Sequence, residues 1–239
     1  MNAKRFRNPV FVALDTPDLN QALEWGRALK DYVGGLKIGL EFITAHGPEG
    51  VRAVVSTGLP VFADVKFHDI PNTVAAASRE LAKLGAMIFN IHVSGGEVMM
   101  RDAVAAARAV DPRVTVIGVT VLTSIDNDIL DTVGQRGPAP EQVVRLARLA
   151  KRAGLDGVVC SAQEIGPIRA ACGPDFLLVT PGIRPAGADT GDQRRIMTPA
   201  EAQRAGSDIM VIGRPITAAP DPVVAARAIA AELGMAAPA

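Results

Sequence analysis

The chain has 239 residues, 49% of them hydrophobic, which is enough to bury one large core and favours one domain of barrel size over two small ones. Lys plus Arg and Asp plus Glu number 25 each, so no overall charge favours binding to nucleic acid or to an anionic membrane. Both cysteines lie in apolar stretches, the N-terminus lacks the apolar run of a signal peptide, and no apolar segment reaches the roughly 20 residues that span a bilayer. We therefore expect a cytoplasmic protein that captures any phosphate locally.

Short runs rich in β-branched residues alternate with longer Ala, Leu and Arg segments of helical period, the pattern of βαβ units with a parallel sheet. The eight expected strands cover residues 10–15, 35–39, 61–67, 87–92, 114–119, 157–160, 176–180 and 209–213. Helix signals lie between them, such as Pro71-Asn72-Thr73 and Thr198-Pro199-Ala200-Glu201. The sequence thus predicts the α/β class, with residues 1–239 forming a single (β/α)8 TIM barrel.

A doubly wound open sheet is the alternative, but it usually has fewer strands and a glycine fingerprint after the first strand. No such fingerprint follows Asp15. In a barrel, the active site lies at the carboxyl ends of the strands, so polar residues at those ends are the first functional candidates. They are Asp15, Lys37, Asp64, Lys66, His92, Ser161, Thr180 and Arg214.

The third expected strand carries the strongest signal, because Asp64 and Lys66 stand two residues apart and side chains at that spacing share a face. Lys37 on the neighbouring strand supplies a second cation at a comparable depth. Ionised groups are costly to bury unless they are paired, so a structural ion pair at the barrel mouth is the competing interpretation. The additional Asp69 and Asp15 favour a catalytic site.

A second signal lies at the end of the eighth strand, where Gly213-Arg214-Pro215 enters a turn. Free backbone N–H groups beside an arginine form an anion site, and barrels often bind phosphate after strands seven and eight. The alternative without a binding function is a glycine turn followed by a solvated arginine. Residues 180–195 form a long polar loop after strand seven, which is typical of a lid, the alternative being a disordered excursion.

A metal site is not expected, although His68 and His92 fall near the mouth together with Asp64 and Asp69. The sequence lacks metal-ligand spacings such as two histidines four apart on a helix. We expect His92 to be hydrogen-bonded at a strand end and His68 to be exposed.

The motifs together resemble the orotidine 5′-monophosphate decarboxylase family over essentially the whole chain. The resemblance rests on Leu14-Asp15 and on residues 35–39, 64–73, 121–124, 180–184 and 211–217. The core Asp-x-Lys-x-x-Asp also occurs in a wider group of sugar-phosphate enzymes. Its extension through Ile70, Pro71, Asn72 and Thr73, joined to Gln193 and Gly213-Arg214, is much more specific.

The resemblance implies a cofactor-free decarboxylation of orotidine 5′-monophosphate to uridine 5′-monophosphate. Lys66 is the implied acid that protonates C6 of the pyrimidine as carbon dioxide leaves, and a cation fixed there stabilises charge that exists mainly in the transition state. Lys37, Asp64, Lys66 and Asp69 form an implied alternating charge array, whose carboxylates favour the charged form of Lys66. Asp69 is expected to reach in from the second subunit of a homodimer.

The resemblance also assigns the substrate contacts. Asp15 and Lys37 are implied to contact the ribose hydroxyls, together with Thr73 across the dimer, and Ile70, Pro71 and Asn72 are expected to join Thr73 in binding substrate. Thr123 and Ser161 are implied to lie near the pyrimidine, although each alone is also compatible with an ordinary capping hydroxyl. Arg184, Gln193, Gly213 and Arg214 are implied to close on the 5′-phosphate, with Gln193 bridging phosphate and base.

Two other functions remain open from the residues. One is a magnesium-dependent keto-sugar-phosphate decarboxylase or hexulose-phosphate synthase on the same barrel, against which Gln193 and the Pro71-Asn72-Thr73 extension argue. The other is a non-catalytic barrel that only binds a phosphorylated ligand, against which the grouping of Lys66 with Asp64 and Asp69 argues.

Overall fold

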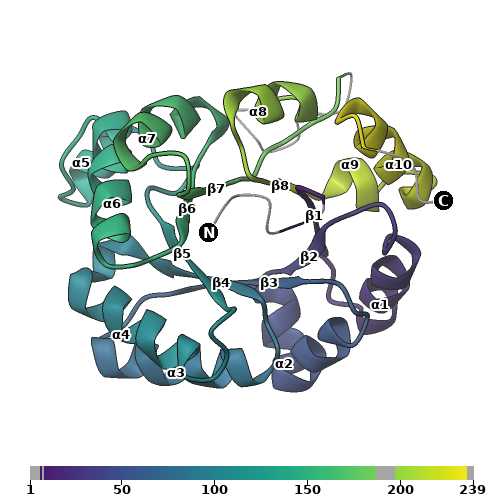
Figure 1. Cartoon of the computed structure of the whole chain (residues 1–239), viewed down its shortest axis with the longest axis horizontal. Helices are drawn as coiled ribbons and strands as arrows, with labels where there is room; N and C mark the ends of the chain where they lie inside the picture. The colour runs from purple at the N-terminus through teal and green to yellow at the C-terminus, as the bar shows by residue number, and fades with distance from the viewer. Residues whose placement is uncertain (1–5, 7, 187–196, 236–239) are drawn as a thin grey trace.

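The computed structural model of the chain describes residues 6, 8–186 and 197–235. Its eight parallel strands close into a barrel in chain order, with the last strand paired to the first (Figure 1). The strands are β1 Val10–Ala13, β2 Gly35–Ile38, β3 Val61–Phe67, β4 Ile88–His92, β5 Thr115–Val119, β6 Gly157–Val159, β7 Leu177–Thr180 and β8 Ile209–Ile212. The predicted TIM barrel is confirmed, and each strand end lies within two residues of its expected position.

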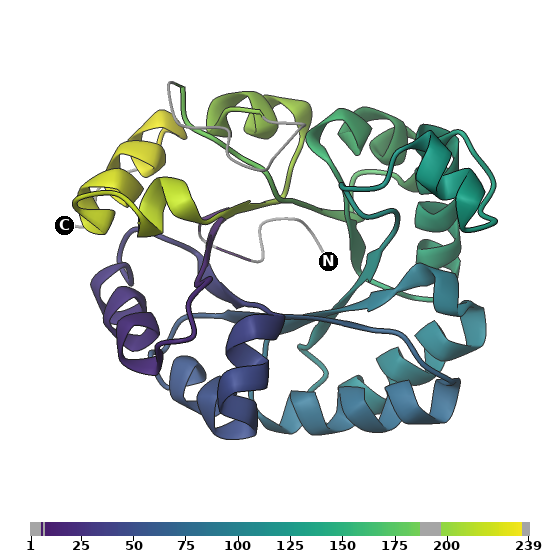
Figure 2. The same ribbon diagram turned by 180° about the vertical axis from the view of Figure 1, so that it is seen from behind.

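The helices form a ring outside the strands in both views of the ribbon (Figures 1 and 2). They are α1 Leu19–Ala28, α2 Leu40–Val55, α3 Pro71–Lys83, α4 Glu97–Arg108, α5 Asn127–Thr132, α6 Ala139–Arg152, α7 Ile165–Cys172, α8 Pro199–Ala205, α9 Arg214–Thr217 and α10 Pro222–Glu232, with short 3₁₀ turns η2 Val93–Gly95 and η3 Ala162–Glu164. The predicted start of α8 is confirmed, since Thr198 and Glu201 form a capping box and Pro199 follows the cap. None of the described helices is long and apolar enough to cross a membrane.

The core has an inner and an outer layer because successive strand residues face opposite sides of the sheet. Along β1, Phe11 points into the barrel, whereas Val10 and Val12 pack against the surrounding helices. The inner layer consists of Phe11, Ala13, Phe62, Ile88, Ile117, Val179, Ile209 and Val211. These side chains fill the barrel, so that a ligand has space only beyond their layer.

Two partly buried ion pairs join the strands at the amino end of the barrel. Asp156, just before β6, accepts hydrogen bonds from Arg108 at 2.7 Å and from the backbone of β5 at 2.8 Å. Asp208, just before β8, accepts from Arg169 and from the backbone N–H of Leu178, both at 2.8 Å. Both carboxylates therefore connect neighbouring strands at the end of the barrel that is usually concerned with stability.

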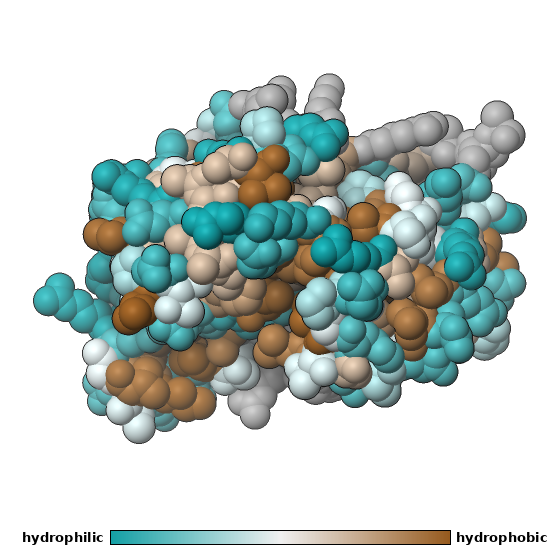
Figure 3. Space-filling model, turned by 90° about the horizontal axis from the view of Figure 1, so that it is seen from below, coloured by the Kyte–Doolittle hydropathy of each residue, from teal (hydrophilic) through white to brown (hydrophobic). Residues whose placement is uncertain are grey.

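The outer surface is mixed in character. On the face seen in Figure 3, hydrophobic side chains lie in several separate groups among hydrophilic ones. Three large apolar side chains are exposed in the segments that follow consecutive strands, with exposed fractions of 55% for Leu40, 66% for Ile70 and 63% for Val98. Because β2, β3 and β4 are neighbours and parallel, these side chains rise from the same sector of the barrel mouth.

Candidate active site

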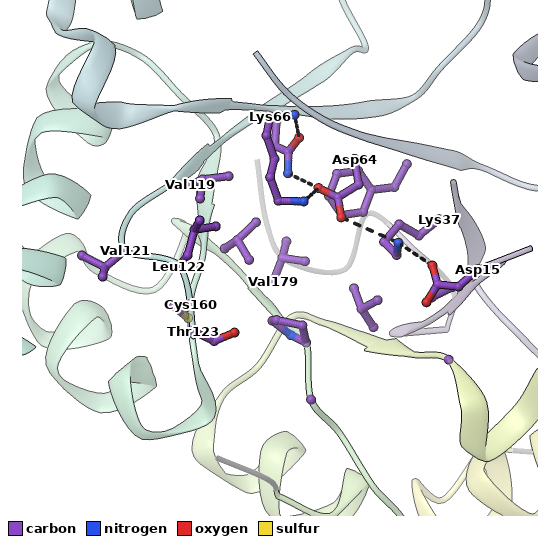
Figure 4. Close-up of a pocket in the computed structure, with 18 of the residues that line it drawn as sticks. Asp15, Lys37, Asp64, Lys66, Val119, Val121, Leu122, Thr123, Cys160 and Val179 are labelled. Carbon is purple, nitrogen blue, oxygen red and sulfur yellow. Dashed lines mark hydrogen bonds and ion pairs between the residues drawn. The ribbon is translucent and has the colours of Figure 1, made fainter. Parts of the chain in front are cut away.

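A pocket of about 280 Å³ opens at the carboxyl end of the barrel. All eight strands contribute residues to it, as expected for the active-site end of this fold. Its lining residues are Ala13, Asp15, Lys37, Phe62, Asp64, Lys66, Asn90, Val119, Val121, Leu122, Thr123, Val159, Cys160, Val179, Pro181, Gly182, Arg184, Val211, Gly213 and Arg214. Charged groups from the first strands face apolar groups from β5 to β7 across this space (Figure 4).

Four charges of alternating sign form a chain along the first three strands (Figure 4). The Lys37 ammonium lies 3.2 Å from an oxygen of Asp15 and 3.7 Å from Oδ2 of Asp64. The other oxygen of Asp64 accepts a 2.5 Å hydrogen bond from Lys66. The structure thus brings together the four strand-end charges that the sequence singled out.

The surroundings of Asp64 act on its pKa in opposite directions. Burial alone would raise its pKa, but the positive charges of Lys37 and Lys66 and the hydrogen bonds from Lys66 and Asn90 outweigh burial and lower the pKa. Asp64 is therefore ionised at neutral pH. A fixed negative charge beside two ammonium groups is an arrangement suited to electrostatic catalysis.

Lys66 has an unusual backbone conformation, with φ of 51°, the only positive value outside glycine among the described residues. Left-handed backbone at such a residue costs roughly 1–3 kcal/mol. From Ala63 to Phe67 the strand advances four residues while its partner β4 advances two, from Phe89 to Ile91. The sequence predicts that Asp64 and Lys66 share a face through regular strand alternation; they do meet, but on a strand whose register shifts between them.

Asn90 in β4 is a pocket residue that the sequence analysis did not select. Its side chain accepts a 2.7 Å hydrogen bond from the backbone N–H of Lys66 and donates one of 2.7 Å to Asp64. The sequence feature that could have identified Asn90 is its position as a polar residue within an apolar strand. In the structure it is 1% exposed, between the fully buried Phe89 and Ile91. Buried amides require partners, and here both partners belong to the charged chain.

The opposite wall of the pocket is apolar. It is formed by Val119, Val121, Leu122, Val159, Cys160, Val179, Pro181 and Val211. Burial raises the pKa of the Cys160 thiol, so this group is neutral and contributes packing rather than nucleophilic chemistry. An apolar wall opposite a row of charges can hold a planar ring with its reacting edge toward the charges.

The loops after β7 and β8 bring two arginines to the pocket. Arg184 is 7% exposed and donates to the carbonyl of Ile183, and Arg214 begins α9 directly after Gly213. Arg184, Gly213 and Arg214 all line the pocket, at the place where the sequence predicts an anion site. Gln193 lies outside the described residues.

Several expected site residues do not line this pocket in the single chain. Asp69 is exposed and accepts a hydrogen bond of 2.6 Å from the backbone N–H of Ile70, whose own side chain points to solvent. Pro71, Asn72 and Thr73 form the first turn of α3, outside the lining. Ser161 is buried and forms a capping box with Glu164, whereas Thr123 does line the pocket.

The two histidines at the mouth lie together, with ring centroids 5.3 Å apart. Burial lowers the pKa of His92, and the neighbouring His68 and Lys66 add to that effect, so His92 is neutral at pH 7. His68 is exposed, as the sequence predicts. Within the described residues, no group of three or more His, Cys, Asp or Glu side chains is arranged to hold a metal ion.

Comparisons of the sequence with known proteins identify one family. A sequence model described as "Orotidine 5'-phosphate decarboxylase / HUMPS family" matches residues 8–229. The orotidine 5′-phosphate decarboxylase of Moorella thermoacetica is 56% identical over 235 residues, covering 96% of this chain and 93% of the relative. That of Paramagnetospirillum magneticum is 52% identical over 95% of this chain and 99% of the relative.

Solved structures show the same likeness in three dimensions. The crystal structure of orotidine 5′-phosphate decarboxylase from Lactobacillus acidophilus has a TM-score of 0.85 and 39% identity, covering 94% of this chain and 98% of that one. An uncharacterised conserved protein from Geobacillus kaustophilus has a TM-score of 0.81 and 38% identity, covering 94% of this chain and 99% of that one.

Proposed function

Because the chain belongs to the orotidine 5′-phosphate decarboxylase / HUMPS family, we propose that it converts orotidine 5′-monophosphate to uridine 5′-monophosphate and carbon dioxide. It is a carboxy-lyase of pyrimidine biosynthesis. The observation that carries this function is the high identity to named decarboxylases over nearly the whole chain. The chain of alternating charges facing an apolar wall gives that function its chemistry.

Lys66 acts as the acid. Loss of carbon dioxide leaves an electron pair on C6 of the pyrimidine, and an ammonium group fixed beside C6 stabilises that charge before delivering a proton to it. The 2.5 Å hydrogen bond to Asp64 sets the direction of the ammonium group, and Lys37 balances the second carboxylate oxygen. The charges are in place before the reaction, so little reorganisation is required in the transition state.

The remaining lining residues hold the substrate. Asp15 and Lys37 bind the ribose hydroxyls, Thr123 and the apolar wall receive the pyrimidine, and Ser161 supports that end of the pocket from its capping position. Arg184 and Arg214, with the backbone at Gly213, bind the 5′-phosphate, for which the planar guanidinium fork is well suited. For Gln193, which lies outside the described residues, we propose the role that the family resemblance implies, a contact with both phosphate and base.

The test is an ultraviolet assay on orotidine 5′-monophosphate, run with and without EDTA. Decarboxylation should proceed equally in both, because protein charges replace the cation that a metalloenzyme uses. Loss of activity in EDTA that magnesium restores would favour a sugar-phosphate enzyme of the same family. Tight binding of uridine 5′-monophosphate without turnover would favour a barrel that only binds its ligand.

The active enzyme is a homodimer in which Asp69 and Thr73 of one chain complete the site of the other, with Ile70, Pro71 and Asn72 at the same contact. Exposed apolar side chains in this sector of the mouth, Leu40, Ile70 and Val98, support a subunit interface there. Two-fold symmetry then creates two equivalent sites. Asp69 is exposed and does not line the pocket of its own chain, which fits a role across such an interface.

Mixing two inactive variants tests the shared site. Lys66→Ala and Asp69→Ala proteins, each nearly inactive alone, are unfolded and refolded together. With unbiased pairing about half of the dimers are mixed and each holds one intact site, so activity should return to roughly a quarter of wild type per site. If Asp69 serves its own chain, every site stays damaged and no activity returns.

The enzyme works in the cytoplasm. Cys160 and Cys172 are both buried free thiols, which a reducing compartment maintains. Fractionation of cells producing the native protein, followed by the decarboxylase assay on each fraction, tests this location.

A further inference from the structure

Asn90 occupies a position on β4 where the barrel's alternation places its side chain in the pocket. Its neighbours Phe89 and Ile91 face the helices and belong to the outer core. Ile88, the preceding inward residue, belongs to the packed layer within the barrel. Asn90 therefore lies where the apolar interior ends and the charged chain begins.

The hydrogen bonds of Asn90 define which way its amide group points. The backbone N–H of Lys66 can only donate, so the atom facing it at 2.7 Å is the carbonyl oxygen of the amide. The ionised carboxylate of Asp64 can only accept, so the atom facing it at 2.7 Å is the amide nitrogen. One short side chain thus supplies an acceptor and a donor to two residues of the charge array.

The backbone at Lys66 requires such a partner. The register between β3 and β4 shifts between Ala63 and Phe67, so Lys66 lies in the irregular part of the ladder. Its N–H donates to Asn90 in place of a backbone carbonyl, and its φ of 51° turns the side chain toward Asp64. The amide of Asn90 is thus connected to both ends of the Asp64–Lys66 hydrogen bond.

We propose that Asn90 is a positioning residue of the reaction, which holds the left-handed turn at Lys66 and the carboxylate of Asp64 in register so that the ammonium group faces the reacting carbon. This role rests on the proposed decarboxylase function. Asn90 need not touch the reacting atoms. It acts through Lys66 and Asp64, whose relative placement determines where the proton is delivered.

Replacing Asn90 by Ala removes both hydrogen bonds without changing the ribose and phosphate contacts. A displacement of a catalytic group by about 1 Å can cost up to about a hundredfold in rate, so kcat should fall roughly ten- to a hundredfold. KM should change by less than about threefold, since ground-state contacts remain. Ile88→Val, which alters the apolar layer beneath and lies outside the pocket lining, is the matched control and should keep its kcat.

Asn90→Asp is the sharper variant because it has the same shape. It keeps an acceptor for the Lys66 N–H but turns a second carboxylate oxygen toward Asp64. Two facing carboxylates readily share one proton, which restores a donor, so kcat relative to wild type should rise as the pH is lowered from about 8 to about 5.5. Lys37 and Lys66 pair with Asp64, and His92 interacts electrostatically with Asp64, Lys66 and His68, in both proteins, so the ratio isolates the substituted residue.

Amide hydrogen exchange provides a measurement that does not depend on activity. The Lys66 N–H should exchange much faster in Asn90→Ala than in wild type, and at the wild-type rate in Ile88→Val. Faster exchange together with the kcat-specific loss supports the positioning role. A kcat within about twofold of wild type in Asn90→Ala, or an unchanged exchange rate at Lys66, would overturn it, whereas a wild-type enzyme inactive on orotidine 5′-monophosphate would overturn only the proposed reaction.

Discussion

The two ends of the barrel contain similar, partly buried charges that differ in how many protein groups they contact. At the amino end, the Arg169 guanidinium donates to Asp208 and to the carbonyls of Gly173, Pro174, Phe176 and Gly206. At the carboxyl end, the Lys66 ammonium is paired with Asp64. The Lys66 side chain lines the pocket and is 31% exposed. Both terminal nitrogens of Arg169 thus donate to protein acceptors, whereas Lys66 lines a pocket in which a substrate can reach it.

This difference separates stability from chemistry. A charge surrounded by protein acceptors connects strands and loops, and its loss leaves a partner buried without compensation. A charge that is exposed in a pocket can contact the substrate and can stabilise the charge that develops in the transition state. Variants at the amino end should therefore lose stability, whereas variants at the carboxyl end should lose turnover.

The largest effect should come from Lys66→Ala. Because the acid and the adjacent cation are both removed, kcat should fall by about a hundredfold to ten-thousandfold or more. Lys83→Ala, which breaks the exposed pair with Glu80 on α3, is the matched control and should retain full activity. A Lys66→Ala protein with normal circular dichroism that decarboxylates within about tenfold of wild type would show that the acid has been assigned to the wrong residue.

Arg169→Ala should be the most destabilising single change at the amino end. It removes the cation from the largely buried Asp208 and the donor to four carbonyls, so the free energy of unfolding should drop by about 3 kcal/mol while the folded enzyme keeps its kcat. Urea denaturation and a turnover assay on the same preparation measure both. In the exposed control Lys83→Ala the loss should be below about 1 kcal/mol. Normal stability combined with lost turnover would contradict the assignment of a structural role to the amino end.

Arg214→Ala sharpens the comparison within the pocket. A charge-assisted hydrogen bond to phosphate is worth roughly 1.5–3 kcal/mol, so kcat/KM on orotidine 5′-monophosphate should fall about tenfold or more. On the nucleoside without phosphate the loss should be much smaller, because the arginine has no ligand there. Exposed Arg204→Ala on α8 is the control. An equal loss on both substrates would place Arg214 outside the phosphate site.

The smallest effect concerns acid stability. The folded pKa of Asp64 lies below its ordinary value of 3.8, so its ionised form stabilises the fold at higher pH, and that stabilisation is lost as the pH falls through the folded pKa. The stability difference between wild type and Asp64→Asn should therefore shrink as the pH is lowered from neutral toward 3, as urea titrations at several pH values can measure. A difference that grows in acid would contradict the lowered pKa.

Much of this architecture could be predicted from residues alone. Runs of β-branched residues located every strand, and the rule that barrels work at the carboxyl ends of their strands selected Asp15, Lys37, Asp64 and Lys66. The pairing of Asp64 with Lys66 was expected from the regular alternation of side chains along a strand. In the structure the pair forms where the register between β3 and β4 shifts and where Lys66 has a left-handed backbone. Alternation could not reveal that departure, because both geometries bring the same two groups together.

Other features depend on contacts between strands or between subunits. Asn90 becomes significant only when β4 lies beside the irregular part of β3, a relation that no local pattern contains. Ser161 was expected near the base, and its place in a capping box shows how the same hydroxyl serves a local role. Roles for Asp69 and Thr73 require a second chain and stay predictions.

The free energy of unfolding of Lys66→Ala tests most directly whether the pocket charges serve chemistry rather than stability. Asp64 keeps Lys37 and Asn90 as partners in this variant, and Ala inherits the same left-handed backbone, so stability in urea should stay within about 1 kcal/mol of wild type even though turnover is lost. A loss of about 3 kcal/mol or more, the size expected for a buried pair that holds the barrel together, would contradict the account.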